Sequence, residues 1–529
     1  MRPRSARSAL PFPHSASVVP LATGSLALVA GLTAGRWAAW QIDLNDVWGL
    51  VYLAQHASVT HIQSLYSGFF PVAYPLALRA AGVGDFSVAA GIANVLTLAL
   101  LSGLTAAAAH RLAGSSAAWL AGLGVLLQPD LFRYGTSAGP DIAAAFAGTI
   151  GAAMLLFAAT AEDSGRRNGT WLVAGLFLGL GALFRYHGLA LAASCLVVSL
   201  ASAPARVRST GLLLAGCLIA YLPQLVVNLA SGHGLFDTAQ AFNVAKTVQP
   251  VNWFELRDGL VPSSIAAVVR DNPGGFARAY VQSALRALPI WLISITAAAV
   301  VDGVRARAWA IRSAVMVVVY TLIVAAGGSS RAPLLVMPLV IVGGASALSA
   351  GWARFSGAAR SRFETIAGRA LLCFLAGTFC LSALVSNLSL VRTRRARSQE
   401  YHALERYLRD VGGVRTARQV FASDFDLYFQ ELPDHRPLVN GGWFRLDLPA
   451  FDELHPQLCV RTVACLVSDA RRLGVTHVVL TSEAAMLSSA LESLRLSSVP
   501  ESEGLVRSGR VGRFEVFSRA IPDCISMRK

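Results

Sequence analysis

The feature that most constrains this chain is a series of apolar runs separated by short segments that carry arginine. The longest runs reach the roughly 20 residues that an α-helix needs to cross a bilayer. Shorter runs must pack inside a bundle or border a polar cavity, because lipid cannot satisfy their ends. The eleven runs are 17–40, 88–109, 116–127, 142–160, 171–183, 189–203, 211–229, 289–304, 310–326, 334–348 and 371–390. The sequence therefore predicts a polytopic α-helical membrane protein with about eleven transmembrane helices.

Composition supports this class. Hydrophobic residues make up 54% of the 529-residue chain and charged residues only 14%, whereas a soluble domain carries about 25% charged residues. The net charge of +15 comes largely from arginines that cluster between the apolar runs, where the charges that orient a membrane protein lie. We therefore assign this charge to membrane topology and expect no nucleic-acid partner.

The arginine clusters also predict an orientation. With the N-terminus in the cytoplasm, the clusters fall in inner loops, and the longer segments rich in aromatic residues fall outside. This alternation fits eleven spans and fails with ten. The basic start resembles a signal peptide, but no small-x-small cleavage site precedes Arg36, so we expect a retained signal anchor. The prediction is a multi-pass protein of the plasma (inner) membrane with an extracytoplasmic C-terminus.

The pattern changes after residue 391. Residues 398–411 form an amphipathic helix pattern, and β-rich runs follow at 420–422, 475–480 and 514–517, with helical stretches between them. Such alternation is typical of a small α/β domain. We therefore divide the chain into a transmembrane module, 1–391, and an extracytoplasmic α/β domain, 392–529.

Two cysteines lie six residues apart in this second part. Cys459 and Cys465 would meet an oxidising compartment if the orientation is right, which favours a disulfide; two free thiols are the open alternative. The sequence has no CxxC pair and no Cys/His cluster with zinc spacing. No cofactor is predicted with certainty, and use of a divalent metal is left open.

Ionisable residues gather on the predicted outer side of the membrane. Asp43 and Asp46 follow the first apolar run, in the segment QIDLNDVW. A carboxylate there can take a proton from an attacking hydroxyl, and an arginine can hold a phosphate with two parallel hydrogen bonds. If the short helices pack together, the outer groups converge on one cavity. The other candidate binding residues are Tyr74, Arg133, Tyr134, Asp141, Arg185, His187 and Arg331.

Each of these residues also has an ordinary structural role that the sequence leaves open. The two aspartates after the first run can lie in a solvated loop. Asp141 follows Gly-Pro and can cap a helix. Arg185 and Arg331 can extend to lipid headgroups. His187 can be structural, and Tyr74 can be an interfacial aromatic residue.

The order of these features resembles the GT-C superfamily of membrane glycosyltransferases, in the branch of protein O-mannosyltransferases and the lipid A aminoarabinose transferase. Residues 43–48 (DLNDVW) resemble the acidic motif of that family's first outer loop, and residues 67–75 are similar to its Tyr-Pro element. Three later segments resemble the acidic start of the fourth helix, the Gly-rich helix that ends in Arg, and the Arg-containing segment before a Pro-marked helix. They are 137–141, 179–189 and 330–339.

The resemblance covers about residues 17–348 and implies an inverting glycosyltransferase. It would move a sugar from a polyprenyl-phosphate donor to an extracytoplasmic glycan, lipid or protein acceptor. Asp46 or Asp43 would be the general base. The family commonly has a tight acidic pair, whereas two residues separate these aspartates; we favour Asp46 because its spacing to Trp48 and Tyr52 is closer to the family's.

The resemblance also assigns roles to the later residues. Arg185 and Arg331 would hold the donor phosphate and stabilise the leaving group. Arg133, Asp141 and His187 would line the sugar or acceptor site, and membrane lipid would be a further partner.

Two other functions fit a polytopic chain. A transporter or flippase of a lipid-linked intermediate usually shows internal repeats and charges near the bilayer midplane. We find no convincing repeat, and the charges sit near one face. A non-catalytic membrane scaffold whose C-terminal domain binds a partner is the third alternative.

Overall fold

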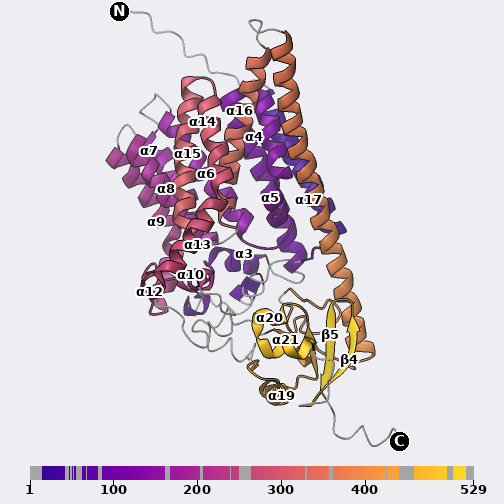
Figure 1. The fold of residues 1–529 in the computed structure, drawn as a ribbon. Coiled ribbons are helices and arrows are strands. Elements are labelled where there is room, and N and C mark those ends of the chain that lie inside the picture. The colour runs from indigo at the N-terminus through magenta and orange to yellow at the C-terminus, as the bar shows by residue number, and fades with distance from the viewer. Residues whose placement is uncertain are drawn as a thin grey trace, which may run out of the picture.

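The computed structural model describes most of the chain. The described residues are 15–41, 47, 50, 51, 53, 54, 62–66, 68–81, 86–160, 167–202, 206–238, 240–248, 264–327, 331–356, 362–424, 426–439, 458–496 and 504–519. The chain forms a bundle of helices with a smaller part, built on a β-sheet, at one end of it (Figure 1).

Every apolar run predicted from the sequence is helical. The long apolar helices are α1 (Ser15–Trp37), α4 (Phe86–Leu127), α6 (Asp141–Thr160), α7 (Arg167–Phe184), α8 (His187–Ser202), α9 (Arg206–Ala230), α14 (Leu288–Val300), α15 (Val304–Ala325), α16 (Met337–Ser356) and α17 (Arg362–Asp410). Shorter helices connect them: η1 (Ile62–Leu65), α3 (Ala73–Ala80), α5 (Pro129–Gly135), α10 (Gln240–Val248), α12 (Ile265–Asp271), α13 (Pro273–Arg286) and η2 (Ala332–Leu335).

Six of the described helices are long and apolar enough to cross a membrane, or seven if α13 and α14 form one bent span. Helices α7 and α8 are apolar but shorter. The count of eleven spans therefore stays a prediction, although several apolar membrane-length helices are present.

Helix α4 is folded back on itself. Ser102 Oγ donates a 3.0 Å hydrogen bond to the Gly122 carbonyl, yet twenty residues of straight helix would separate these groups by about 30 Å. The reversal lies at Ala113 and Gly114, whose backbone is not helical. Gly114 has a φ of 80°, a conformation that glycine adopts without steric cost. The two limbs correspond to the two apolar runs that the sequence separates here.

Glycines let neighbouring helices approach closely. A Cβ on Gly175 of α7 would lie 2.1 Å from the Leu213 carbonyl oxygen of α9, and a Cβ on Gly216 would lie equally close to Leu172. Small residues at such crossings replace side-chain packing by backbone contact. This contact fixes α7 against α9, and α7 leads directly to Arg185.

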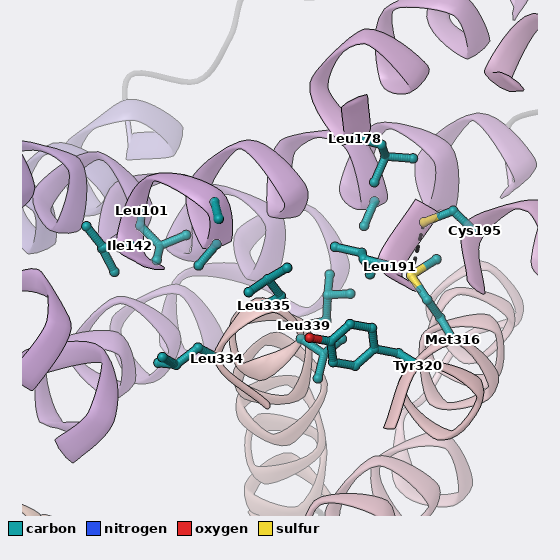
Figure 2. Packing of buried hydrophobic residues seen from close by; sticks show 14 of the residues in the cluster. Leu101, Ile142, Leu178, Leu191, Cys195, Met316, Tyr320, Leu334, Leu335 and Leu339 are labelled. Carbon is teal, nitrogen blue, oxygen red and sulfur yellow. Dashed lines mark hydrogen bonds between the residues drawn. The ribbon is translucent and has the colours of Figure 1, made fainter. Parts of the chain in front are cut away.

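The core of the bundle joins helices that are far apart in sequence. Figure 2 shows Leu101, Ile142 and Leu191 packed towards Leu335 and Tyr320, with residues from α4, α6, α8, α15 and η2 in one cluster. All five side chains are fully or almost fully buried. This packing places the ends of α6, α8 and η2 beside one another.

Helix α17 links the bundle to the C-terminal sheet. It runs along one side of the bundle and reaches the sheet without a break (Figure 1). The predicted boundary between residues 391 and 392 falls inside this helix, because the apolar span and the following amphipathic pattern are continuous. Tyr401, Leu404 and Leu408 are buried, as the pattern predicts, whereas Val411 is 71% exposed because it lies just beyond the helix end.

The C-terminal part contains a five-stranded sheet in the order β2-β1-β3-β5-β4. The first three strands in this order pair in parallel, and β5 pairs antiparallel with β3 and β4. The three predicted β-rich runs coincide with β1, β3 and β5. The strand bounds are β1 (Val420–Ala422), β2 (Leu438–Val439), β3 (His477–Leu480), β4 (Leu505–Val511) and β5 (Phe514–Arg519).

Helices cover both faces of this sheet. Alternate residues of β1 point in opposite directions: Phe421 packs with the helices α19 (Val463–Arg472), α20 (Ala484–Leu487) and α21 (Ser489–Leu496). Val420 and Ala422 pack with the end of α17, and the turn η3 (Ala417–Gln419) precedes β1. That this part forms a separate domain outside the cytoplasm stays a prediction.

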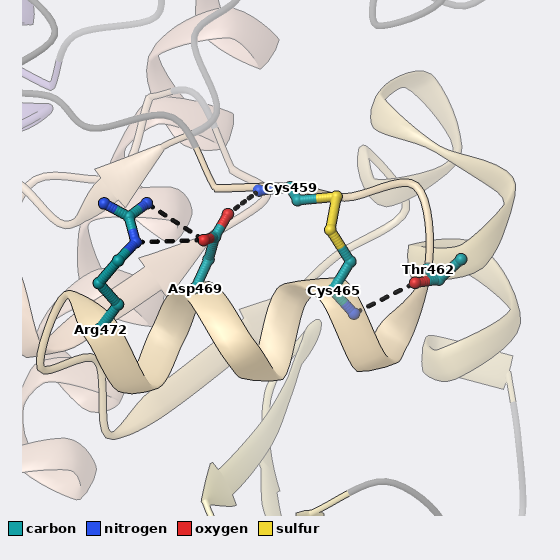
Figure 3. Close-up of a disulfide and its surroundings, with 5 residues drawn as sticks. All are labelled: Cys459, Thr462, Cys465, Asp469 and Arg472. Atoms are coloured by element: carbon teal, nitrogen blue, oxygen red, sulfur yellow. Dashed lines mark hydrogen bonds and ion pairs between the residues drawn. A yellow bond between two sulfur atoms is a disulfide. The ribbon is translucent and has the colours of Figure 1, made fainter.

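A disulfide staples the start of α19. Cys459 and Cys465 are bonded, with their Cα atoms 5.5 Å apart (Figure 3). Thr462 caps the helix by accepting a hydrogen bond from the Cys465 amide. Asp469 accepts a 2.8 Å bond from the Cys459 amide and pairs with Arg472. The short loop before α19 is therefore held by the disulfide and by two hydrogen bonds.

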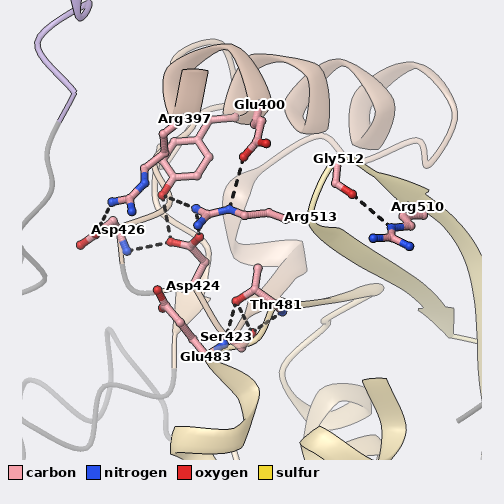
Figure 4. A network of polar contacts seen from close by, with 11 residues as sticks. Arg397, Glu400, Ser423, Asp424, Asp426, Thr481, Glu483, Arg510, Gly512 and Arg513 are labelled. Carbon is pink, nitrogen blue, oxygen red and sulfur yellow. Dashed lines mark hydrogen bonds and ion pairs between the residues drawn. The ribbon is translucent and has the colours of Figure 1, made fainter. Parts of the chain in front are cut away.

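A polar network joins α17 to the sheet (Figure 4). The Asp424 carboxylate, which is fully buried, pairs with Arg513 in the β4–β5 turn and accepts a 2.9 Å bond from the Tyr401 hydroxyl. Arg397 pairs with Asp426 at 2.9 Å, and Glu400 pairs with Arg513. These contacts fix the sheet against the end of the long helix.

Close packing of α7 on α9 yields a stability test. Gly175→Ala should lower the free energy of unfolding by about 1–3 kcal/mol, the cost of overpacking a tight contact, measured as a loss of thermal stability in detergent. Gly211→Ala is the matched control, because a Cβ there meets nothing within 4 Å and alanine is the better helix former. Equal losses in both variants would contradict the close helix contact.

Candidate functional site

A buried ion pair lies at the centre of the candidate site. Arg185 Nε is 2.9 Å from Asp141 Oδ1, and the two side chains are 12% and 2% exposed. Asp141 opens α6, and Arg185 lies in the turn between α7 and α8. The second carboxylate oxygen of Asp141 is buried and has no hydrogen-bond partner among the described residues.

One amide side chain, that of Asn94, binds the loop before Asp141. Asn94, in the first limb of α4, donates to the carbonyl oxygens of Ser137 at 2.5 Å and Gly139 at 2.8 Å. The Tyr74 hydroxyl accepts a 2.8 Å bond from the Gly139 amide. Asn94 and Tyr74 are both buried. Together they fix the backbone that leads to Asp141. The Tyr74 hydroxyl therefore helps to position Asp141 through the Gly139 amide.

A second support comes from α17. The Arg394 side chain is 3% exposed. It donates to Thr136 Oγ1 at 2.7 Å and to the Arg133 carbonyl at 2.8 Å. The helix that carries the C-terminal sheet thereby holds the end of α5 and the loop that leads to Asp141.

Two guanidinium groups flank the ring of Tyr134. The Arg133 group lies 5.6 Å from the ring centroid and the Arg331 group 5.9 Å. Burial raises the pKa of Tyr134, with Arg331 acting in the opposite direction. The phenol therefore stays protonated at neutral pH. Arginine stacks readily on aromatic faces and is well suited to bind carboxylate and phosphate groups.

The segment after Arg331 is fixed by Tyr320 of α15, whose hydroxyl donates a 2.5 Å bond to the Ala332 carbonyl. Tyr320 also interacts electrostatically with Arg185 and Asp141. His187, two residues after Arg185, has Arg185 and Arg331 as its charged neighbours. The two arginines, although 146 residues apart in sequence, thus act on the same imidazole.

The structure therefore brings together most of the predicted residues. Asp141, Arg185, His187, Tyr134 and Arg331 gather where α5, α6, α8 and η2 meet. Arg185 does not extend to the lipid, because its guanidinium pairs with a buried carboxylate. The same ion pair engages the Asp141 carboxylate. Among the described residues, the Asp141 side chain makes no hydrogen bond that caps α6. Asp43 and Asp46 lie outside the described residues, so the assignment of the base to one of them stays a prediction.

Sequence reasoning missed the residues that support the cluster. Asn94 interrupts an apolar run, and that is a usable signal for a buried polar contact. Arg394 stands in the basic segment RTRRAR, where nothing separates it from its exposed neighbours. Gln224, which is fully buried, accepts a 3.0 Å bond from the Val72 amide and donates to Asn228. It fixes the start of α3, which carries Tyr74.

No group of three His, Cys, Asp or Glu side chains gathers in the part of the chain that the structure describes. The divalent metal that the sequence leaves open is untested by this geometry.

Part of the chain matches a known protein family. Residues 71–227 match the family described as dolichyl-phosphate-mannose-protein mannosyltransferase. This segment holds Tyr74, Asn94, Asp141 and Arg185. It covers less than half of the chain. No curated protein sequence matches the chain.

Solved membrane transferases share the fold. ArnT from Cupriavidus metallidurans bound to undecaprenyl phosphate is 14% identical, with a TM-score of 0.52, over 94% of this chain and 98% of ArnT. The oligosaccharyltransferase of Archaeoglobus fulgidus in its apo form is also 14% identical, with a TM-score of 0.54, over 89% of this chain and 72% of that protein. Both are GT-C glycosyltransferases. The predicted resemblance to this superfamily is confirmed.

A double-mutant cycle tests the ion pair. Asp141→Asn should lower the free energy of unfolding by about 3–5 kcal/mol, because it leaves the Arg185 charge buried without its partner. Asp141→Asn combined with Arg185→Gln should cost less than the sum of the single changes, by about 0.5–3 kcal/mol. Denaturation in mixed micelles measures both.

The matched control for this cycle is Arg354→Gln, which removes an arginine whose pairing with Asp302 is exposed and should change stability little. Additive losses at Asp141 and Arg185 would show that the two groups do not interact.

Proposed function

We propose that this chain, which has the GT-C fold, is an inverting glycosyltransferase that takes a sugar from a polyprenyl-phosphate donor. The single observation that carries the proposal is that Arg185, which pairs with the buried Asp141 carboxylate, and Arg331 both lie near His187. Arginines grouped beside a carboxylate are a setting that suits an anionic ligand with hydroxyl groups. The solved ArnT structure contains undecaprenyl phosphate, which is a ligand of this chemistry.

The donor phosphate would lie against the two arginines. Their planar guanidinium groups match phosphate geometry. Asp141 would hold Arg185 in place through Oδ1, and its buried Oδ2 would accept a hydrogen bond from a sugar hydroxyl. Arg133 and His187 would line the rest of the sugar or acceptor site, with Tyr134 between the arginines.

The reaction would be a single displacement at the anomeric carbon. The acceptor hydroxyl would lose its proton to a carboxylate, Asp46 by preference or Asp43, as its oxygen forms the new bond from the opposite face. The bond between the anomeric carbon and the phosphate oxygen would break, with its electron pair passing to the phosphate. Arg185 and Arg331 would stabilise that charge as it develops, the kind of interaction that contributes most to such reactions.

Several finer features belong to the same proposal. The site would face the extracytoplasmic side of the plasma (inner) membrane, with the N-terminus in the cytoplasm and residues 392–529 outside. The acceptor would be a glycan, a lipid or a protein of the cell envelope. A transporter or a scaffold would bind the lipid-linked sugar, or a partner, without consuming the donor.

The phosphate-binding role predicts a kinetic effect. Arg331→Gln should slow consumption of labelled polyprenyl-phosphate sugar by about 100–1000-fold, the loss seen when one charge-stabilising donor is removed. Arg354→Gln, on the exposed end of α16, should leave turnover unchanged. Unaltered turnover in Arg331→Gln would remove this residue from the site.

The proposed base predicts complete loss of transfer. Asp46→Asn together with Asp43→Asn should abolish sugar transfer while membrane insertion and the melting temperature stay close to those of the unaltered protein. Assaying each single variant would identify the base. Retained transfer in the double variant would refute the assignment to either aspartate.

The proposed orientation predicts the redox state of the disulfide. In intact cells, Cys459 and Cys465 should react with a maleimide only after reduction, because an extracytoplasmic compartment keeps the bond oxidised. The Cys459→Ser/Cys465→Ser variant shows the background from the remaining cysteines. Labelling of both thiols without reductant would place this part of the chain in the cytoplasm.

A further inference from the structure

An open cleft of about 630 Å³ lies where the end of α1 meets the middle of α17. This volume is within the range of small-molecule sites. The cleft is separate from the Asp141 cluster and is lined by other residues. Those that matter here are Thr33, Arg36, Trp37, Arg395, Gln399 and His402.

The cleft is basic and aromatic. Arg36 and Arg395 contribute two positive charges, and none of the described residues that line the cleft is acidic. The Arg395 guanidinium lies 5.3 Å from the centroid of the Trp37 ring, and Trp37 is 43% exposed. Tryptophan and arginine in this arrangement are typical of the level at which a membrane meets water. The charge of the cleft suits an anionic headgroup.

An apolar stripe leads from the cleft along α17. His402, Arg395, Leu388 and Leu381 follow one another at seven-residue spacing, so they lie nearly on one face of the helix. Leu388 is 43% exposed and Leu381 64% exposed. The basic end of this face therefore continues into a surface on which a hydrocarbon chain can lie.

A second apolar stripe leads away along α1. Arg36 and Val29 are also seven residues apart, and Val29 is 64% exposed. Helix α1 packs chiefly on α4 and much less on α17, and Trp37 near its end contacts Arg395 of α17. Both helices that border the basic cleft thus carry exposed apolar residues, which suits a lipid with one phosphate and two chains better than a lipid with a single chain.

We propose that this cleft binds an anionic glycerophospholipid of the membrane. Its phosphate would lie between Arg36 and Arg395, with His402 and Gln399 beside it, and its acyl chains along α1 and α17. The site does not depend on the proposed transferase activity. It would tie the end of α1 to α17 just before the chain enters the segment that holds Asp43 and Asp46.

Lipid retention tests the proposal. The full-length protein, purified in detergent, would be titrated with phosphatidylglycerol or phosphatidylcholine, and bound lipid counted by native mass spectrometry. The unaltered protein should retain phosphatidylglycerol preferentially. Arg36→Gln/Arg395→Gln should reduce that retention by about tenfold, since two exposed charge contacts are lost, with phosphatidylcholine retention unchanged. Equal retention by variant and unaltered protein would overturn the proposal.

The matched control is Arg278→Gln/Arg286→Gln, which removes two exposed arginines of α13 and should leave phosphatidylglycerol retention intact. Equal loss in this control would show that overall charge, and not the cleft, governs binding. A third titration uses undecaprenyl phosphate: if the Arg36/Arg395 variant loses this lipid and keeps phosphatidylglycerol, the cleft is a polyprenyl-phosphate site and the proposal fails. Unchanged melting temperatures would show that both variants are folded.

Discussion

The ion pair between Asp141 and Arg185 is the interaction on which the site depends. Removing two charges from water is costly, and a buried pair often stabilises a protein no better than apolar side chains would. Here the pair lies where α6 meets the α7–α8 turn, with one carboxylate oxygen still unpartnered. A stability role alone does not account for that oxygen or for a second arginine, Arg331, close by. The proposed lipid-linked sugar would contact both.

Much of the surrounding structure keeps this pair in place. Asn94, Tyr74 and Arg394 bind the backbone between residues 133 and 139 from three different helices. Each of these side chains is buried, so its contacts are made away from water and resist exchange. Functional groups act well when the residues around them leave little freedom. The long helix α17 therefore serves the site as well as the C-terminal sheet.

Local patterns in the sequence predict the helices and strands but only part of the candidate site. The strands at 420–422, 477–480 and 514–519 and every apolar helix follow from hydropathy and β-propensity. The gathering of Asp141, Arg185 and Arg331 follows from placing polar groups on one side of the bundle. Arg394 could not be predicted, because its partner lies more than 250 residues away and its neighbours are chemically alike. The continuity of α17 was also missed, since a polar stretch after an apolar span usually ends the helix.

The most direct measurement is a structure of the protein with a non-hydrolysable polyprenyl-phosphate sugar analogue. The account predicts that the phosphate lies within hydrogen-bonding distance of both Arg185 and Arg331, with a sugar hydroxyl facing Asp141. A phosphate bound elsewhere, with the Asp141–Arg185 ion pair intact and no ligand in contact with it, would contradict this prediction.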